Sequence, residues 1–241
     1  METGEILWSA EPQGWGEPSA NRPVFYKNLI IIGALWRRMF ALDINTGKEV
    51  WDLQPTLSSF FYSTPLVSCD RLIVPAGNGI YVLNAANGAV RREVIGCGMY
   101  MLHAGSGAGD AAVQKKACFD TSAQPVLDGD ELYIGTVNNG VLALKAGTYE
   151  TLRHYPVGKC LTYTSGYSKL DHGTVDGHIL VEENCLRFAA SDGYLYTYGK
   201  KNALLMDRQW MGAPSFVAPV RFGGGIATVD LRGRVTVFPE R

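Results

Sequence analysis

The stretch FALDINTGKEVW, Phe40 to Trp51, joins one strand pattern to another through a tight turn. Apolar residues alternate with others along Arg38 to Asn45, which is the period of a strand with one buried face. A Thr-Gly pair then supplies the turn into a strand that ends in Trp51. Nearly the same letters open the chain as TGEILW, Thr3 to Trp8, where no strand pattern precedes them. The chain is therefore expected to contain an internal repeat.

The same short strand recurs along the chain, anchored at Leu42, Leu83, Leu144, Thr197 and Val237. Two further strand patterns precede each copy, and PVLDGDELYIGTVNNG, Pro125 to Gly140, shows them most clearly. A Pro opens the first strand, a polar turn follows, and ELYIGTV is the second strand. Each unit thus predicts four antiparallel strands in about 40–45 residues, which is typical of a β-propeller blade. A β-sandwich would not require so regular a repeat.

We predict an all-β, single-domain chain that forms a five-bladed propeller of four-stranded antiparallel blades. The blades are expected at about 20–53, 61–94, 122–157, 176–210 and 214–240, with inserts at about 95–120 and 158–175. The fifth unit lacks a fourth strand, whereas the N-terminal TGEILW is a fourth strand without its first three. We expect residues 1–9, with Thr3 to Ser9 as the strand, to complete the sheet of Phe216 to Phe238 and close the ring. The alternative is a window from a longer array of seven or eight blades.

Composition argues against several classes of protein. The chain has 22 basic and 23 acidic residues, so it lacks the basic excess of a nucleic-acid binder. No run of about 18 apolar residues occurs, and no membrane span is expected. The five cysteines include no CxxC pair, which argues against a zinc site. They are expected to be free thiols, or to include a Cys97–Cys118 disulfide if the protein is exported. No N-terminal targeting sequence is visible, which fits a cytoplasmic protein, a mature form or a fragment.

The repeat unit resembles the pyrroloquinoline-quinone-like (PQQ-like) propeller repeat. The resemblance lies in FALDINTGKEVW, TGEILW, IYVLNAANG (Ile80 to Gly88) and DELYIGTVNNGVLALKAG (Asp130 to Gly147). In that family the Trp that ends the unit packs between blades. The resemblance implies this role for Trp8 and Trp51, and for Trp210 after a longer turn. Arg92 and Thr151 stand in the same place in the second and third units, so those blades are expected to be held differently.

The resemblance also implies what the protein does. Family members that hold the quinone have eight blades, a disulfide between adjacent cysteines and a calcium site with a catalytic Asp. This chain has no adjacent cysteines and too few residues for eight blades, so we expect no quinone, no metal and no catalysis. Other members resemble non-catalytic modules: the lipoprotein of the outer-membrane β-barrel assembly machinery, ectodomains of bacterial kinases, and modules attached to hydrolases such as metallophosphoesterases. Most are bacterial and exported, and they imply a protein partner or a neighbouring domain.

A ligand site is expected where the inner strands of a propeller begin, at the mouth of its channel. The residues before these strands are Asn21 and Arg22, Ser63 and Thr64, Ala123 and Gln124, Gly177 and His178, and Val217 and Ala218. Together Arg22, Thr64, Gln124 and His178 suit a small anion or a carbohydrate. The other interpretation is that they hydrogen-bond each other and ordered waters in a narrow channel.

Other motifs carry weaker signals for chemistry. A propeller glycosidase needs two carboxylates at these strand starts, and Asp120 and Asp176 alone come close, out of register with each other. The spacing from His172 to His178 matches no familiar metal-ligand pair. The Gly-rich Gly105 to Ala112 lacks the strand-then-helix context of a phosphate loop.

A second candidate surface lies at the hairpin LWRRMF, where Trp36, Arg37 and Arg38 have the composition of an interaction hot spot. The alternative there is a Trp packed on the neighbouring insert beside two solvated Arg side chains. We therefore expect a non-catalytic binding module for a protein or a neighbouring domain. A small-ligand or carbohydrate sensor is the alternative function, and a glycosidase or a domain fused to a hydrolase is less favoured.

Overall fold

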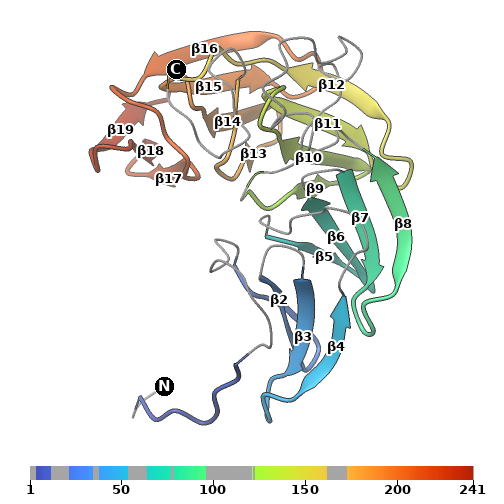
Figure 1. Cartoon of the computed structure of the whole chain (residues 1–241). Helices are drawn as coiled ribbons and strands as arrows, with labels where there is room; N and C mark the ends of the chain where they lie inside the picture. The colour runs from blue at the N-terminus through green and yellow to red at the C-terminus, as the bar shows by residue number, and fades with distance from the viewer. Residues whose placement is uncertain are drawn as a thin grey trace, which may run out of the picture.

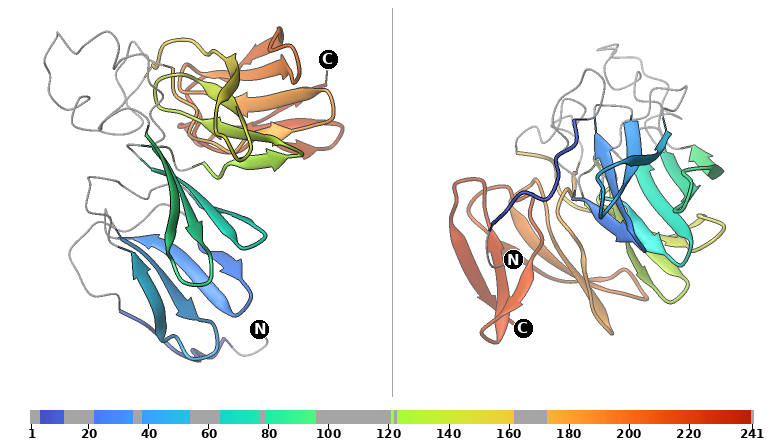
Figure 2. Two further views of the ribbon diagram at one scale, coloured as in Figure 1. Left: turned by 90° about the vertical axis from the view of Figure 1, so that its right-hand side faces the viewer. Right: turned by 90° about the horizontal axis from the view of Figure 1, so that it is seen from below.

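The computed structural model describes residues 4–11, 22–34, 38–53, 64–76, 79–95, 121, 123–161 and 173–240. These residues form five antiparallel sheets, which follow one another in chain order around an open arc (Figure 1). We call the sheets blades 1 to 5. The first strand of each blade lies on the inside of the arc, and the two further views show the blades stacked face to face (Figure 2). No helix among the described residues is long and apolar enough to span a membrane.

Blades 1 to 4 each contain four strands that pair with their chain neighbours, as the repeat predicted. Blade 1 comprises β1 (Val24–Tyr26), β2 (Leu29–Ala34), β3 (Arg38–Asp43) and β4 (Glu49–Leu53). Blade 2 comprises β5 (Leu66–Ser68), β6 (Arg71–Ala76), β7 (Gly79–Asn84) and β8 (Val90–Ile95). Blade 3 comprises β9 (Val126–Asp128), β10 (Glu131–Gly135), β11 (Val141–Lys145) and β12 (Thr151–Tyr155). Blade 4 comprises β13 (Leu180–Val181), β14 (Cys185–Ala189), β15 (Tyr194–Gly199) and β16 (Leu205–Trp210).

Blade 5 differs from the others and corrects one prediction. It has three strands in the described part of the chain: β17 (Val220–Phe222), β18 (Gly225–Val229) and β19 (Val235–Pro239). Residues 4–11 form no strand, and the indole of Trp8 donates a hydrogen bond to the carbonyl oxygen of Ile44 in blade 1, at 2.9 Å. The two ends of the arc are separated by a gap (Figure 1). The predicted closure of blade 5 by Thr3 to Ser9 is therefore wrong for residues 4–9, because Trp8 holds them at the opposite end of the arc.

The turn between the third and fourth strands shows how the repeated Thr-Gly motif folds. In blade 1, the carboxylate of Asp43 accepts hydrogen bonds from the backbone amides of Asn45 and Thr46, at 3.0 and 2.9 Å. Gly47 follows with a φ of 70°, a conformation that residues with a Cβ disfavour. A Cβ at Gly47 would also lie 2.6 Å from the ring of Trp8. The glycine therefore both closes the turn and leaves room for the indole that arrives from the preceding segment.

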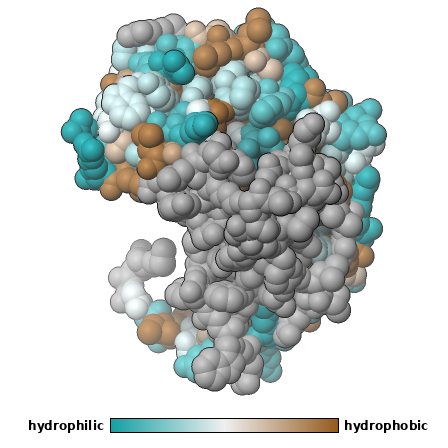
Figure 3. Space-filling model, turned by 45° about the horizontal axis from the view of Figure 1, so that its top comes forward, coloured by the Kyte–Doolittle hydropathy of each residue, from teal (hydrophilic) through white to brown (hydrophobic). Residues whose placement is uncertain are grey.

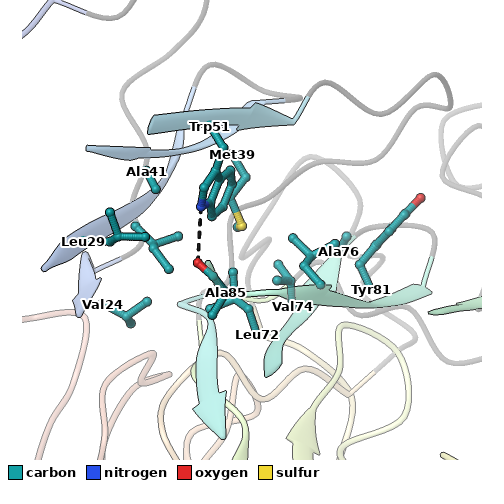
Figure 4. Packing of buried hydrophobic residues seen from close by; sticks show 12 residues of the cluster. Val24, Leu29, Met39, Ala41, Trp51, Leu72, Val74, Ala76, Tyr81 and Ala85 are labelled. Carbon is teal, nitrogen blue, oxygen red and sulfur yellow. Dashed lines mark hydrogen bonds between the residues drawn. The ribbon is translucent and has the colours of Figure 1, made fainter. Parts of the chain in front are cut away.

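Trp51 repeats this contact at the junction between blades 1 and 2. Its indole donates to the carbonyl oxygen of Ala85, at 3.2 Å, and a Cβ at Gly88 would lie 2.6 Å from its ring. The side chain is buried with Met39 and with Leu72 of blade 2 (Figure 4). Trp8 and Trp51 thus occupy equivalent places one blade apart, and the implied packing of Trp between blades holds for Trp51.

The next two junctions use polar side chains instead. Arg92 donates hydrogen bonds to the carbonyl oxygens of Gly147 and Thr148 in the equivalent turn of blade 3, and its guanidinium lies 5.3 Å from the ring centre of Tyr149. Between blades 3 and 4, the hydroxyl of Tyr155 donates to the carbonyl oxygen of Lys200, at 2.5 Å. The units without the terminal Trp are therefore held by hydrogen bonds to the backbone of the same turn region in the next blade.

An ion-pair cluster strengthens the junction of blades 3 and 4. The carboxylate of Glu131 forms ion pairs with Arg153 of its own blade and with Lys201 of blade 4, the latter at 3.2 Å. It also accepts a hydrogen bond from the hydroxyl of Tyr133, at 2.5 Å. Burial raises the pKa of Glu131, but the hydrogen bonds from Arg153, Tyr133 and Lys201 outweigh it and lower the pKa to about 2. Glu131 is therefore charged at neutral pH.

Candidate functional site

The residues predicted at the channel mouth lie along the inner rim of the arc, where they connect successive blades. The backbone amide of Arg22 donates to the hydroxyl of Thr64, at 3.0 Å, across the junction of blades 1 and 2. The side-chain amide of Gln124 donates to the carbonyl oxygen of Pro65, at 2.6 Å, across the junction of blades 2 and 3. Thr64 is 3% exposed. The side chains of Thr64 and Gln124 thus hold neighbouring blades together by hydrogen bonds.

His178 continues the rim from blade 3 to blade 4. Its imidazole hydrogen-bonds the backbone of Gln124. Burial lowers the pKa of His178, and the positive charge of Arg22 lowers it further, against the effect of that hydrogen bond. The ring is therefore neutral at pH 7. The interaction also shows that the arc brings Arg22 of blade 1 and His178 of blade 4 within electrostatic reach of each other.

The last step of the rim uses backbone alone. A Cβ at Gly177 would lie 2.4 Å from the carbonyl oxygen of Val217, so the backbones of blades 4 and 5 approach closely where Gly177 has no side chain. Val217 itself is 44% exposed. The structure therefore assembles Arg22, Thr64, Gln124 and His178 along one rim. Their binding of a ligand stays a prediction.

The hairpin predicted as an interaction surface is described in part. Trp36 and Arg37 lie outside the described residues. Arg38 is 7% exposed, and its guanidinium forms ion pairs with Asp52 and Glu49, at 2.8 and 2.5 Å. The charge of Arg38 is therefore used within blade 1, and the binding of a partner at this hairpin stays a prediction.

Several other candidates also fall outside the described residues, among them Asp120, Cys97, Cys118 and His172. Asp176 is buried, with 9% exposure. Cys69, Cys160 and Cys185 are free thiols. Within the described ranges, no three His, Cys, Asp or Glu side chains gather as metal ligands.

The strand β16 carries a surface that the sequence reasoning missed. Met206, Arg208 and Trp210 alternate along it and are all exposed, with Met206 at 63% and Trp210 at 50%. Trp210 does not pack on the next blade. Its ring meets Tyr194 of its own blade at 5.0 Å between ring centres, and the guanidinium of Arg208 lies 5.1 Å from the centre of the same Tyr194 ring. We call Met206, Arg208 and Trp210 the β16 stripe.

The signal for the β16 stripe was present in the chain. Residues at i and i+2 of a strand share one face, so Arg208 and Trp210 lie together once β16 is placed, whereas Met206 sits at a bulge where the register shifts. The resemblance to the repeat family led instead to a junction role for Trp210. The outer strand of blade 1 shows the difference, since its Trp51 is 7% exposed.

Comparisons with known proteins give a family and a fold. The family model described as "Outer membrane protein assembly factor BamB" matches residues 1–193. BamB from Moraxella catarrhalis is similar in structure, with a TM-score of 0.65 and 21% identity over 88% of this chain and 57% of that one. The quinohemoprotein alcohol dehydrogenase from Comamonas testosteroni has a TM-score of 0.64 and 16% identity over 98% of this chain and 42% of that one.

A designed protein, Ika8, shows the same likeness, with a TM-score of 0.61 and 14% identity over 90% of this chain and 57% of that one. No curated protein matches the sequence. The chain spans less than two thirds of the length of each of these three structures. At these identities, the three structures support the fold alone.

Proposed function

We propose, since this chain belongs to the PQQ-like repeat family described as outer membrane protein assembly factor BamB, that it is a non-catalytic module that binds a protein partner through the β16 stripe. The observation that carries the proposal is the half-exposed Trp210 beside Arg208 and Met206. Trp, Tyr and Arg dominate the residues that contribute most to protein–protein binding, and exposed Met adapts to varied partner surfaces.

The position of the stripe supports this role. β16 is the outer strand of blade 4, on the periphery of the arc (Figure 1). Leu204 and Leu205 precede the stripe and are 63% and 47% exposed, so exposed apolar side chains lie on both sides of Arg208 along the strand. The outer strand of blade 1 begins with Glu49 and Val50, and that of blade 2 begins with Val90 and Arg91. Blade 4 therefore begins with two apolar residues, Leu205 and Met206, where these two blades have one apolar and one charged residue.

The chemistry of the stripe also defines the surface it fits. A partner would need an apolar pocket for the Trp210 ring and a carboxylate or carbonyl within reach of the Arg208 guanidinium. We expect the partner to be a protein of the cell envelope and the chain to be exported, as the description of the family implies. We expect neither a quinone nor a metal at this surface.

A photo-crosslinking experiment tests the proposal. A photoreactive amino acid replaces Met206 in the full chain, in the organism that encodes it, and mass spectrometry identifies the crosslinked proteins. The matched control places the same group at Leu152, which is 41% exposed on the outer strand of blade 3. We expect a specific adduct at position 206 that is absent at position 152. With the purified partner, Trp210→Ala should weaken binding by about 30-fold or more. Equal adducts at the two positions would contradict the proposal.

The inner rim supports a second candidate function, the binding of a small anionic ligand or carbohydrate. The supporting observation is that burial, and then the positive charge of Arg22, lower the pKa of His178 on the same rim. Titration calorimetry with phosphate and with acidic sugars tests it, and His178→Ala should abolish any binding. His154→Ala is the control, because its ring is held by the carbonyl oxygen of Asn139, at 2.6 Å, away from the inner strands. Unchanged binding in His178→Ala would dismiss this candidate.

A further inference from the structure

Aromatic side chains of blades 3 and 4 form a row of rings that runs from the surface into the core. In order, the row contains Trp210, Tyr194, Tyr196, Tyr198 and Tyr155. The distances between successive ring centres are 5.0, 6.2, 5.9 and 5.7 Å. Rings whose centres lie within about 7 Å are in contact. We call this set the aromatic row, and its contacts provide a continuous route for an electron.

The alternation of side chains along a strand explains how the aromatic row is built. Tyr194, Tyr196 and Tyr198 lie at every second position of β15, so their rings share the face of the strand that packs on blade 3. Trp210 pairs with Tyr194 at the end of the neighbouring strand β16. On the other side, Tyr155 comes from β12 of blade 3 and meets the ring of Tyr198. Two blades therefore supply the row.

The aromatic row reaches solvent at Trp210. This side chain is 50% exposed, whereas Tyr196 and Tyr198 are 3% and 4% exposed and Tyr155 is fully buried. The part of the surface where β16 lies carries hydrophilic residues among hydrophobic ones (Figure 3). A small, charged molecule in water can therefore reach the indole of Trp210 but not the buried phenols.

A carboxylate lies at the hydroxyl of Tyr196. This hydroxyl donates a hydrogen bond to Oδ2 of Asp192, at 2.5 Å. Asp192 is 6% exposed, and the backbone amides of Gly158 and Tyr194 donate to its carboxylate at 2.8 and 3.2 Å. Burial, and then the hydrogen bond to Asp192, raise the pKa of Tyr196, so the phenol is protonated at neutral pH. Tyr196 thus holds a proton that already points at a base.

The hydroxyls of the other two fully enclosed tyrosines in the row have weaker acceptors. Tyr198 and Tyr155 donate to backbone carbonyl oxygens, those of Pro156 and Lys200, each at 2.5 Å. Loss of an electron makes a phenol strongly acidic, so a tyrosine is oxidised most easily where a base takes its proton at the same time. A carbonyl oxygen is too weak a base to keep that proton. Of these three buried tyrosines, Tyr196 is therefore the one that is expected to be oxidised.

Tyr133 lies beyond the inner end of the row, with its ring centre 6.4 Å from the last ring, and donates to the carboxylate of Glu131. That carboxylate already forms ion pairs with Arg153 and Lys201. Because two cations stabilise its charged form, Glu131 is a poor acceptor for a proton. The base that suits proton uptake therefore lies at Tyr196, nearer to the surface.

We propose that Trp210, Tyr194 and Tyr196 form a one-electron redox path by which a small oxidant in solution oxidises a buried tyrosine. The oxidant removes one electron from the indole of Trp210, which becomes a radical cation. An electron then moves from Tyr196 through the ring of Tyr194 and restores Trp210. The phenolic proton of Tyr196 moves at the same time to Oδ2 of Asp192. The oxidant is thus reduced by one electron, and the protein holds a neutral tyrosine radical beside a protonated carboxyl group.

The buried position of the radical lets the path run in reverse. A reductant that supplies one electron restores Tyr196, because Asp192 returns the proton and no bond between heavy atoms is broken. We therefore expect the chain to consume one-electron oxidants at its surface. This activity is separate from partner binding at the β16 stripe and is measured on the chain alone, so either proposal can fail without the other.

Laser flash photolysis of the full chain tests the entry of the path. Photogenerated tris(bipyridine)ruthenium(III) serves as the one-electron oxidant, and transient absorption follows the tryptophan and tyrosine radicals separately. We expect the tryptophan radical to decay as the tyrosine radical appears. Trp210→Phe should lower the yield of the tyrosine radical several-fold, whereas Trp8→Phe, at a partly exposed indole on blade 1, should leave it unchanged. Equal yields in the natural protein and in Trp210→Phe would overturn the proposal.

Tyrosine substitutions test where the path ends. Tyr196→Phe keeps the ring but removes the hydroxyl, so it should lower the yield of the tyrosine radical several-fold and prolong the lifetime of the tryptophan radical. Tyr198→Phe is the matched control, because its ring centre lies 5.9 Å from that of Tyr196 and its hydroxyl donates to a carbonyl oxygen. We expect this control to behave as the natural protein does. Equal yields of the tyrosine radical in the two variants would also overturn the proposal.

The proton transfer to Asp192 is tested on the natural protein and on one variant. Formation of the tyrosine radical in the natural protein should be slower in heavy water than in ordinary water, because a proton moves with the electron. Asp192→Asn should slow it by about 100-fold, a typical contribution of a positioned proton acceptor, once circular dichroism has confirmed that the variant is folded. Equal rates in the two solvents would overturn the role of Asp192, whether or not the variant folds.

Discussion

The junction between blades 1 and 2 and the junction between blades 3 and 4 hold neighbouring blades together with different chemistry. At the first, Trp51 fills the turn of the next blade with an indole that is 7% exposed. At the other, Tyr155 and the Glu131 cluster reach across with hydrogen bonds and ion pairs. The repeat therefore conserves the place of contact, the turn region of the next blade, while the side chain that makes the contact changes.

The apolar junction is expected to be the most sensitive to truncation. Trp51→Ala removes a buried ring and leaves a cavity beside Gly88, and it should lower the free energy of unfolding by about 3–5 kcal/mol. Urea titration followed by circular dichroism measures the loss. Trp210→Ala is the control, and because its ring is 50% exposed we expect a loss below about 1 kcal/mol. Equal losses would mean that the two Trp residues are not distinguished by their packing.

The polar junction should respond to acid instead. The pKa of Glu131 is about 2 in the folded protein against an ordinary value of 4.5, so its charged form stabilises the fold above pH 4.5. This contribution, about 3 kcal/mol, is lost as the pH falls from 4.5 toward 2. Thermal unfolding across that range measures it. Glu131→Gln should flatten the pH dependence and lower stability at pH 7, whereas the exposed Glu150→Gln should change neither. An unaltered acid profile in Glu131→Gln would contradict the assignment.

A single hydroxyl tests the direct contact between blades 3 and 4. Tyr155→Phe keeps the buried ring but leaves the carbonyl oxygen of Lys200 without its donor, which should cost about 1–2 kcal/mol. Urea unfolding measures the change. Tyr26→Phe, on the half-buried Tyr26 of blade 1, should cost less than about 0.5 kcal/mol. A loss no greater than this control would show that the hydroxyl contributes little to the junction.

The smallest effect is expected at the junction of blades 2 and 3. Arg92 is exposed, so Arg92→Ala should cost about 0.5–1 kcal/mol through its two backbone hydrogen bonds and its contact with Tyr149. Arg92→Trp sharpens the comparison, because Tyr149, with a φ of 62°, takes the place in this turn that Gly47 and Gly88 take in blades 1 and 2, and its ring is buried. An indole at position 92 would meet this ring where Trp8 and Trp51 meet a glycine, so we expect Arg92→Trp to be less stable than the natural protein in thermal unfolding. A stability equal to that of the natural protein would show that the turn accommodates both rings.

Much of the fold followed from the sequence because strand alternation and turn chemistry are local. The Thr-Gly turn at Gly47 and the Trp that fills it can be recognised from a few neighbouring letters, and blades 1 to 4 have the predicted strands. The substitute contact of Arg92 could not be recognised in this way. Its partners are carbonyl oxygens in a turn 55 and 56 residues away, and backbone carbonyls leave no trace in a sequence pattern.

The incorrect closure and the β16 stripe have related causes. The repeat identified TGEILW as an outer strand, but it does not specify which sheet that strand joins, and Trp8 lies against blade 1. Trp210 was expected at a junction after a longer turn, yet its ring lies on Tyr194 of its own blade, and Asp207 holds the place of Trp51 in the strand pairing. The inner-rim residues were placed together because propeller geometry itself groups the starts of the inner strands. A strand's identity is encoded locally, whereas its neighbour is decided by tertiary contact.

The open arc also has a consequence for how the protein unfolds. Among the described residues, the blades follow one another along the arc, so the cost of opening one blade depends on how many neighbours it has. Blade 5 has three strands in the described part of the chain, and its amides should exchange with deuterium earliest among the sheets. Protection should rise toward blades 2 and 3, in a gradient set by position in the array.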